Sequence, residues 1–156
     1  VVVSPDHGGA TRARNLANIL DTSIAIVDKR RPRPNVCEAQ SVIGDVDGKD
    51  CIVVDDICDT AGSLVAACDI LKRFGAKDIY VCLAHGVFSG PAIERLENSC
   101  IKEVVCTNSI PLDEEKKAQT TKIKQLSIGL MLSKLILAIS SHKPVSEIYR
   151  LFEDHE

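Results

Sequence analysis

The chain has 156 residues, 45% of them hydrophobic and 26% charged, a composition typical of one soluble globular domain with a sizeable core. Its net charge of -3 argues against nonspecific nucleic-acid binding. No apolar run approaches the roughly 20 residues of a membrane helix, because Lys134 interrupts the longest one. No signal-peptide pattern is present, so we expect a cytoplasmic protein, or an organellar one if a transit peptide preceded Val1.

Strand patterns and helix patterns alternate along the chain, without internal repeats or low-complexity linkers. The predicted strands cover residues 1–4, 24–28, 51–55, 78–84 and 102–106. The predicted helices cover residues 9–20, 61–74, 90–98 and 128–141. This alternation predicts an α/β fold, a mostly parallel sheet flanked by helices, with ligands bound beyond the carboxyl ends of the strands.

A double-glycine loop follows the first predicted strand, at residues 4–10 (SPDHGGA). Paired glycines let backbone amides approach an anion at the start of a helix, so Gly8 and Gly9 predict a phosphate pocket. The alternative interpretation of such a pair is a purely structural turn. His7 is expected to serve the loop as a hydrogen-bonding residue rather than as a ligand.

A basic segment follows the second predicted strand, at residues 28–35 (DKRRPRPN). Four of five consecutive positions are cationic, and two prolines exclude a helix, so we expect a projecting arm. Such an arm is usually a solvated loop or a nucleic-acid patch. Beside phosphate pockets it suits a lid whose Lys29 and Arg31 neutralise charge on a transferring diphosphoryl group.

The third predicted strand runs into the most informative segment, residues 53–63 (VVDDICDTAGS). Asp59 and Thr60 are expected to cap the helix that follows, and the N–H groups of its first turn favour a phosphate. Gly62 permits close backbone approach to a ligand, while Ser63 adds a hydroxyl donor.

Two further acids, Asp55 and Asp56, come shortly before this helix. Carboxylates there accept hydrogen bonds from a sugar diol or face a magnesium ion. The simpler interpretation is that the acids only cap a helix and solvate a loop.

The chain contains seven cysteines and no C-x-x-C pair. Most of them lie in apolar runs, where a thiol behaves as a small hydrophobe. We therefore expect reduced, buried thiols rather than disulfides or a zinc site. Cys58 lies within the acid-rich segment, but nothing in the pattern assigns it a chemical role.

Residues 51–63 resemble the ribose-phosphate binding loop of type I phosphoribosyltransferases and of ribose-phosphate pyrophosphokinases. In that family four apolar residues precede two acids, two variable residues and Asp-Thr-Ala/Cys-Gly-Ser/Thr, and this chain matches throughout. Residues 4–9 resemble the pyrophosphate loop of the kinases, and the Lys-x-Arg arm resembles their flexible catalytic loop. The resemblance continues through residues 84–91 and 107–111, so it covers nearly the whole chain.

The resemblance implies a reaction of nucleotide biosynthesis in which the diphosphate of ATP moves to the anomeric hydroxyl of ribose 5-phosphate, giving phosphoribosyl pyrophosphate and AMP. It implies that Lys29 and Arg31 are catalytic and that Asp6 binds Mg²⁺. The residues implied to bind ribose 5-phosphate are Asp55, Asp56, Asp59, Thr60, Ala61, Gly62 and Ser63. The implied pyrophosphate loop consists of Asp6, His7, Gly8 and Gly9.

The resemblance also implies that residues 1–156 form a single C-terminal phosphoribosyltransferase-like domain, a fragment that lacks the similar N-terminal domain. That other domain carries the family's ATP-binding segment, so we expect the fragment alone to be inactive. Family members assemble from dimers into hexamers, so we expect a homo-oligomer. The apolar helix at 128–141 then packs either in the core or in a subunit interface.

Two alternatives remain open. A phosphoribosyltransferase that consumes phosphoribosyl pyrophosphate would share the loop and the fold, but it would need a platform that stacks a base. Aromatic residues make up only 3% of the chain, and tryptophan is absent. A noncatalytic regulatory subunit of the synthetase would also share the fold, and the retained Lys29 and Arg31 argue against it.

Overall fold

The computed structural model describes residues 1–30, 39–146 and 148. The chain divides into two compact units, Val1–Gln125 and Leu126–Glu156. The first unit contains both phosphate-loop segments and the beginning of the basic segment.

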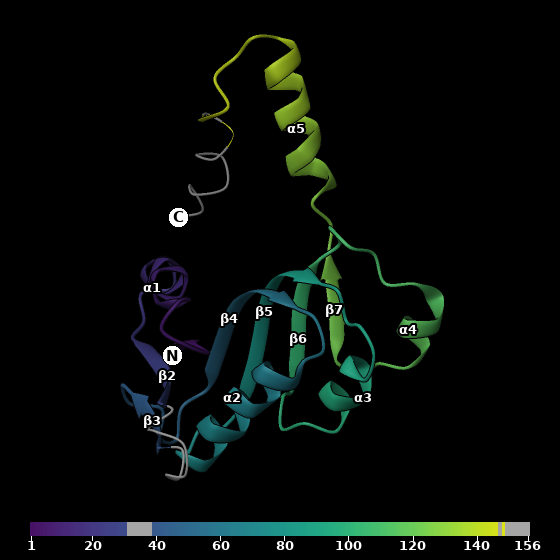
Figure 1. Cartoon of the computed structure of the whole chain (residues 1–156). Coiled ribbons are helices and arrows are strands. Elements are labelled where there is room, and N and C mark those ends of the chain that lie inside the picture. The colour runs from purple at the N-terminus through teal and green to yellow at the C-terminus, as the bar shows by residue number, and fades with distance from the viewer. Residues whose placement is uncertain (31–38, 147, 149–156) are drawn as a thin grey trace. The chain divides into compact units, whose positions relative to one another are not determined.

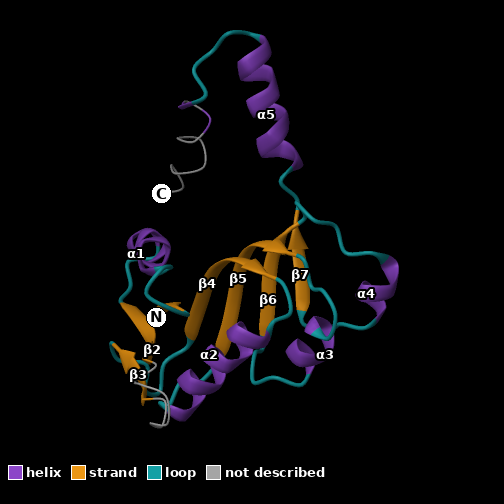
Figure 2. Ribbon diagram, in the orientation of Figure 1, coloured by secondary structure: helices purple, strands orange, loops and turns teal. Residues whose placement is uncertain are grey.

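Strands and helices alternate through most of the described chain (Figures 1 and 2). The strands are β1 (Val2–Ser4), β2 (Ile24–Arg30), β3 (Ala39–Ile43), β4 (Cys51–Cys58), β5 (Ile79–Gly86), β6 (Glu103–Thr107) and β7 (Ile123–Leu126). The helices are α1 (Ala10–Ile19), α2 (Gly62–Arg73), α3 (Ala92–Glu97), α4 (Glu114–Ala118) and α5 (Gly129–Ser140).

The strands form one seven-stranded sheet in the order β3-β2-β1-β4-β5-β6-β7. The neighbours from β2 to β6 pair in parallel, and β3 pairs with β2 in the antiparallel sense. The predicted mostly parallel α/β sheet is therefore confirmed. The strands β3 and β7 and the short helix α4 were not predicted.

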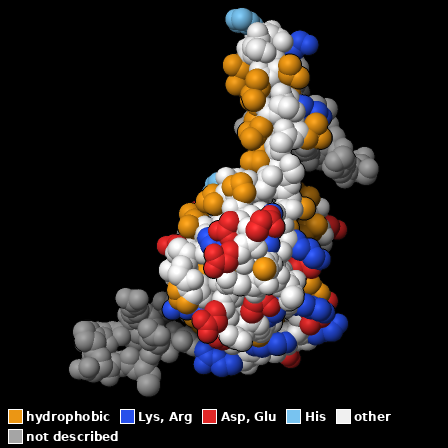
Figure 3. Space-filling view, turned by 90° about the vertical axis from the view of Figure 1, so that its right-hand side faces the viewer, with side chains coloured by type: hydrophobic (Ala, Val, Ile, Leu, Met, Phe, Trp, Pro, Cys, Tyr) orange, Lys and Arg blue, Asp and Glu red, His pale blue; other side chains and the backbone are white. Residues whose placement is uncertain are grey.

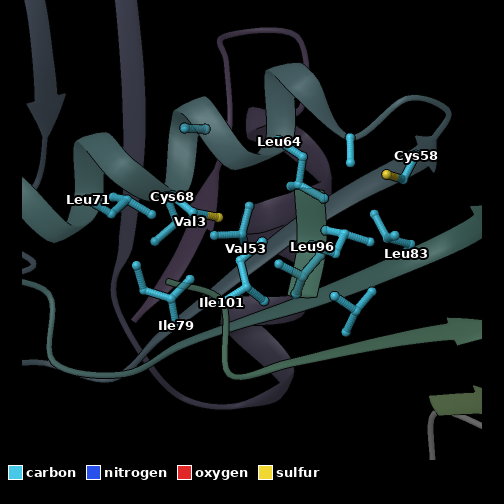
Figure 4. Close-up of a cluster of buried hydrophobic side chains, with 14 of the residues drawn as sticks. Val3, Val53, Cys58, Leu64, Cys68, Leu71, Ile79, Leu83, Leu96 and Ile101 are labelled. Carbon is cyan, nitrogen blue, oxygen red and sulfur yellow. The ribbon is translucent and has the colours of Figure 1, made fainter. Parts of the chain in front are cut away.

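Apolar side chains cover both faces of the sheet. On one face, α2 and α3 pack against alternate residues of the central strands (Figures 1 and 4). Leu64, Cys68 and Leu71 recur with helical spacing on α2 and point toward Val3 and Val53 of the sheet. On the other face, α1 buries Ala13 and Ala17 against Val2 and Val54, strand residues adjacent in sequence to Val3 and Val53. Burial on both faces explains why the central strands are nearly continuous apolar runs.

The helix α2 ends as its sequence predicts. Lys72 and Arg73 lie in its last turn, where cations favour the negative end of the helix dipole. Gly75 follows with a φ of 92°, a left-handed conformation that favours glycine.

Replacing Gly75 by alanine should destabilise the chain by about 1–2 kcal/mol more than the same change at Gly48. Both glycines have positive φ, but a Cβ at Gly75 would lie 2.0 Å from Asp47 Oδ1, whereas a Cβ at Gly48 meets nothing within 4 Å. Urea unfolding of the two variants measures the difference. Equal unfolding free energies would show that Asp47 moves aside without cost.

The second unit contains α5, and most of the large apolar side chains of this helix are exposed, as the orange side chains in Figure 3 show. They are Leu130, Leu132, Ile136, Leu137 and Ile139. Ala138 is the buried residue of this helix. Among the described residues, no helix combines the length and apolarity needed to span a membrane.

Candidate functional site

Three segments that the sequence singled out meet at one edge of the sheet. The strands β2, β1 and β4 are neighbours and run parallel. The basic segment begins within β2, the double-glycine loop follows β1, and the acid-rich segment ends β4. Because the carboxyl ends of parallel strands lie at the same edge, the three segments converge there.

Local hydrogen bonds fix the double-glycine loop. Ser4 Oγ donates to the Asp6 carbonyl at 2.6 Å, and the Gly9 amide donates to Asp6 Oδ1 at 3.1 Å. A Cβ at Gly9 would lie 2.6 Å from Ser4 Oγ, so this position requires glycine. Gly9 is also the N-cap of α1, and it has no side chain that could cap the helix. Backbone N–H groups of the first turn of α1 therefore face the loop without a side-chain cap.

His7 contacts the end of β2. Its Nε2 lies 3.1 Å from Asp28 Oδ1, and Asp28 is buried although His7 is exposed. The expectation of a hydrogen-bonding histidine agrees with this contact. The contact ties the double-glycine loop to the residue that precedes Lys29.

An arginine that the sequence analysis did not select bridges the acid pair. Arg12 Nη1 lies 3.2 Å from Asp55 Oδ1, and Arg12 Nη2 lies 3.0 Å from Asp56 Oδ2. The Asp56 amide also donates to Asp55 Oδ1 at 2.9 Å. Arg12 lies three residues after Gly9, in the first turn of α1. This position beside the double-glycine loop is the sequence feature that could have pointed to Arg12.

The pKa values of the two neighbouring carboxylates shift in opposite directions. Burial raises the pKa of Asp55, with a further rise from the neighbouring Asp56 charge. For Asp56, burial opposes the change, but the Arg12 charge and the hydrogen bond with Asp55 lower the pKa of this carboxyl. Asp56 therefore carries the negative charge of the pair to lower pH than Asp55 does.

The loop between β4 and α2 is held by residues that precede or lie on α3. Ser89 Oγ donates to Asp59 Oδ1, and Arg95 Nη1 donates to the Thr60 carbonyl at 2.9 Å. The Ser89 amide donates to the Asp59 carbonyl at 3.0 Å. Ser89 and Arg95 lie about 30 residues further along the chain, so helix periodicity gave no signal for these contacts.

The expected capping of α2 by Asp59 and Thr60 is wrong. The N-cap is Ala61, which has a φ of 61° and makes no side-chain cap hydrogen bond. Asp59 accepts from Ser89 instead, because the turn projects its carboxylate toward the segment before α3. The first turn of α2 therefore has no acidic cap, which keeps its N–H groups available to an anionic ligand.

The basic segment begins inside the sheet rather than after it. Asp28, Lys29 and Arg30 belong to β2, and Lys29 pairs with Gln40 of β3. The predicted projecting arm is therefore wrong for Asp28, Lys29 and Arg30: Asp28 is buried, and Lys29 and Arg30 extend the predicted strand by two residues. Arg31, the second predicted catalytic residue, lies outside the described residues.

Cys58 is buried beneath this site as a neutral thiol. Burial raises its pKa to about 11. Because the unfolded thiol has a pKa of about 8.5, Cys58 contributes stability that is present below about pH 8.5 and is lost as the pH rises toward 11. The other described cysteines also form no disulfide with one another; Cys51, Cys68 and Cys106 are buried, and Cys82 and Cys100 are half-buried.

Alkylation of Cys58 by iodoacetamide at pH 8 should be about a hundredfold or more slower in the folded chain than in urea, because both burial and the small thiolate fraction protect the sulfur. Mass spectrometry of the peptide that contains Cys58 measures the two rates. Similar rates in both states would contradict the protected thiol.

Residues 28–150, most of the chain, match the profile described as phosphoribosyl synthetase-associated domain. The chain belongs to this family. The predicted family resemblance is thereby confirmed.

Curated relatives of this chain are named ribose-phosphate pyrophosphokinase. Ribose-phosphate pyrophosphokinase of Staphylococcus saprophyticus is 54% identical over 149 residues, which are 96% of this chain and 46% of that protein. The protein of the same name from Staphylococcus aureus strain Mu50 is 52% identical over the same share of each chain. The chain thus spans about half the length of the curated relatives that it matches.

Solved structures confirm the fold of this family member. Phosphoribosylpyrophosphate synthetase from Mycobacterium smegmatis superposes with a TM-score of 0.82 at 37% identity, over 90% of this chain and 45% of that chain. Orotate phosphoribosyltransferase from Aeropyrum pernix superposes with a TM-score of 0.55 at 20% identity, over 81% of this chain and 58% of that one. The second likeness shows the fold alone, which is the predicted type I phosphoribosyltransferase fold.

Proposed function

We propose that the protein containing this chain is a ribose-phosphate pyrophosphokinase, which transfers the diphosphate of ATP to the anomeric hydroxyl of ribose 5-phosphate. The observation that carries the proposal is the convergence of the double-glycine loop, the acid-rich loop and the beginning of the basic segment at one sheet edge. The named relatives at 52–54% identity support the same reaction.

The acid-rich loop would bind the sugar phosphate. Backbone N–H groups at the start of α2, together with the hydroxyls of Thr60 and Ser63, suit the 5-phosphate. Asp55 and Asp56 are placed a few residues before this turn, so they would accept hydrogen bonds from the ribose hydroxyls. Asp59 shapes the turn through Ser89, while Ala61 and Gly62 bring the backbone close to the phosphate.

The double-glycine loop and the basic segment would hold the diphosphate that is transferred. Gly8 and Gly9 allow backbone amides to approach it, and Lys29 and Arg31 would neutralise the charge that develops during transfer. The described residues contain no group of three or more His, Cys, Asp or Glu side chains that could hold a metal ion. Mg²⁺ at phosphoryl-transfer sites commonly uses one or two carboxylates together with substrate phosphates, and Asp6 supplies such a carboxylate. Bound Mg²⁺ would neutralise the phosphates of ATP.

The proposal extends to the whole protein. This chain would be the C-terminal of two similar domains, and the other domain would supply the ATP-binding segment. The family resemblance favours a homo-oligomer assembled from dimers into a hexamer, acting in the cytoplasm. ATP and ribose 5-phosphate would be its small-molecule partners.

The decisive experiment incubates the full-length protein with ATP, Mg²⁺ and ribose 5-phosphate and measures AMP. Formation of AMP that depends on ribose 5-phosphate supports the proposal. Absence of AMP, with consumption of added phosphoribosyl pyrophosphate and a base, would support the phosphoribosyltransferase alternative. Absence of both reactions would support the alternative of a noncatalytic regulatory subunit.

A further inference from the structure

We propose that Arg12 is a positioning residue that holds the carboxylates of Asp55 and Asp56 in one orientation toward the bound sugar. This inference rests on the proposed function, because it assigns the acid pair a ligand with neighbouring hydroxyls. It adds a residue from the helix after the double-glycine loop to a site otherwise built from the acid-rich loop.

Strand geometry creates the need for such a residue. Asp55 and Asp56 are consecutive residues of β4, and consecutive side chains of a strand point to opposite faces. Two hydroxyls of one sugar ring, however, require two acceptors on the same side. The guanidinium of Arg12 reaches both carboxylates, at 3.2 Å and 3.0 Å, and so draws them toward a common point.

The same contact also reduces the electrostatic repulsion between the two carboxylates. Two adjacent carboxylates repel each other, and a cation between them removes that repulsion. The planar guanidinium offers donors in a fixed fork, so one group satisfies two acceptors with defined directions. A lysine at position 12 would retain the charge but not the fork.

Fold stability does not account for the contact. The Arg12 side chain is 38% exposed and that of Asp56 is 59% exposed, and ion pairs at such exposures contribute little to stability. We therefore expect Arg12→Ala to fold. The contact instead connects α1, which begins at the double-glycine loop, to the acids of the second loop.

The test compares Arg12→Ala and Arg12→Lys with Arg14→Ala, a matched change at an exposed residue of the same helix. The first measurement uses NMR scalar couplings at fixed neutral pH, without ligand, to determine the χ1 rotamer populations of Asp55 and Asp56. The expected result is one dominant rotamer for each acid in the wild type and in Arg14→Ala, and averaged rotamers in Arg12→Ala. If the couplings in Arg12→Ala still show one dominant rotamer for each acid, the proposal is overturned.

The second measurement titrates the same variants calorimetrically with ribose 5-phosphate and with inorganic phosphate, both in the presence of magnesium chloride. Arg12→Ala should weaken ribose 5-phosphate binding about tenfold, the scale of a lost charged hydrogen bond, and Arg12→Lys should be intermediate. Inorganic phosphate does not need the acid pair, so its affinity should change by less than about twofold. Equal weakening for both ligands would indicate a general structural effect and overturn the proposal.

The two measurements separate this inference from the proposed function. If the wild type binds phosphate but shows no preference for ribose 5-phosphate, the proposed function fails, and the rotamer populations alone decide whether Arg12 positions the acids. If the wild type prefers ribose 5-phosphate and Arg12→Ala keeps that preference, the function stands and the role of Arg12 is refuted.

Discussion

Replacing Lys29 by alanine in the full-length protein is expected to lower the turnover number about a hundredfold or more, while the affinity for ribose 5-phosphate stays nearly unchanged. The reason is that the charge of Lys29 would act on the diphosphate during transfer, whereas the sugar is bound by residues of the loop after β4. An interaction made mainly in the transition state affects kcat rather than ground-state binding. Rates of AMP formation over a range of both substrates measure this split.

The matched control for Lys29→Ala is Lys77→Ala. Lys77 is exposed and precedes β5, at the opposite, amino end of the sheet, so its removal should leave both kinetic constants unchanged. A turnover number for Lys29→Ala within a few-fold of the wild type would refute the catalytic role of Lys29. A fall in ribose 5-phosphate affinity equal to the fall in turnover would place Lys29 in sugar binding instead.

The position of Lys29 also shows how the site is assembled. It follows Asp28, which is buried and contacts His7 of the double-glycine loop at 3.1 Å. Its backbone is fixed by antiparallel pairing with Gln40. The basic segment therefore starts within the sheet, next to the loop proposed to hold the diphosphate.

The sequence was sufficient to predict the elements with strong apolar patterns. The five predicted strands are all present, because each contributes buried residues to the core around the sheet. The three missed elements lack that signal. The strand β7 (IKQL) has two apolar residues, the helix α4 (EEKKA) has no buried residue, and β3 exists as an edge strand because β2 continues through Arg30 to pair with it. The two strands depend on pairing with neighbouring strands, which local propensity does not encode. The helix α4 is instead a short segment capped locally by the Asp113 side chain.

The candidate site was predictable in its loops but not in its supporting contacts. Glycine and acid patterns placed the loops correctly after β1 and β4, since parallel strands bring their carboxyl ends together. The bridge from Arg12 joins residues 43 positions apart, and those from Ser89 and Arg95 span 30 and 35 positions. Such contacts depend on the relative placement of helices and strands, so the sequence alone gave no basis for choosing Ser89 and Arg95, and for Arg12 it gave only the position beside the double-glycine loop.

Phe88 is the largest fully buried side chain among the described residues, and it belongs to the same core cluster as Cys58 at the end of β4 and Ala61 of the loop that follows. Its amide donates to the Cys58 carbonyl at 3.2 Å, and the Val87 amide donates to the same carbonyl at 3.0 Å. The ring packs so closely over Gly86 that a Cβ there would lie 2.2 Å from Phe88 Cε2. The ring thus fills the core and supports the backbone that leads into the proposed sugar-phosphate loop.

Replacing Phe88 by alanine is expected to lower the free energy of unfolding by about 3–5 kcal/mol, because the change removes a buried ring and leaves a cavity. Phe74→Ala is the matched control. Phe74 is 43% exposed at the end of α2, so its loss should cost only about 1 kcal/mol. Urea unfolding at 25 °C measures both changes.

Because the lost ring supports the loop after β4, phosphate affinity should also fall in Phe88→Ala and not in Phe74→Ala. Equal unfolding midpoints for the two variants would show that the core closes around the missing ring, and unchanged phosphate affinity in Phe88→Ala would show that the loop keeps its conformation without this support.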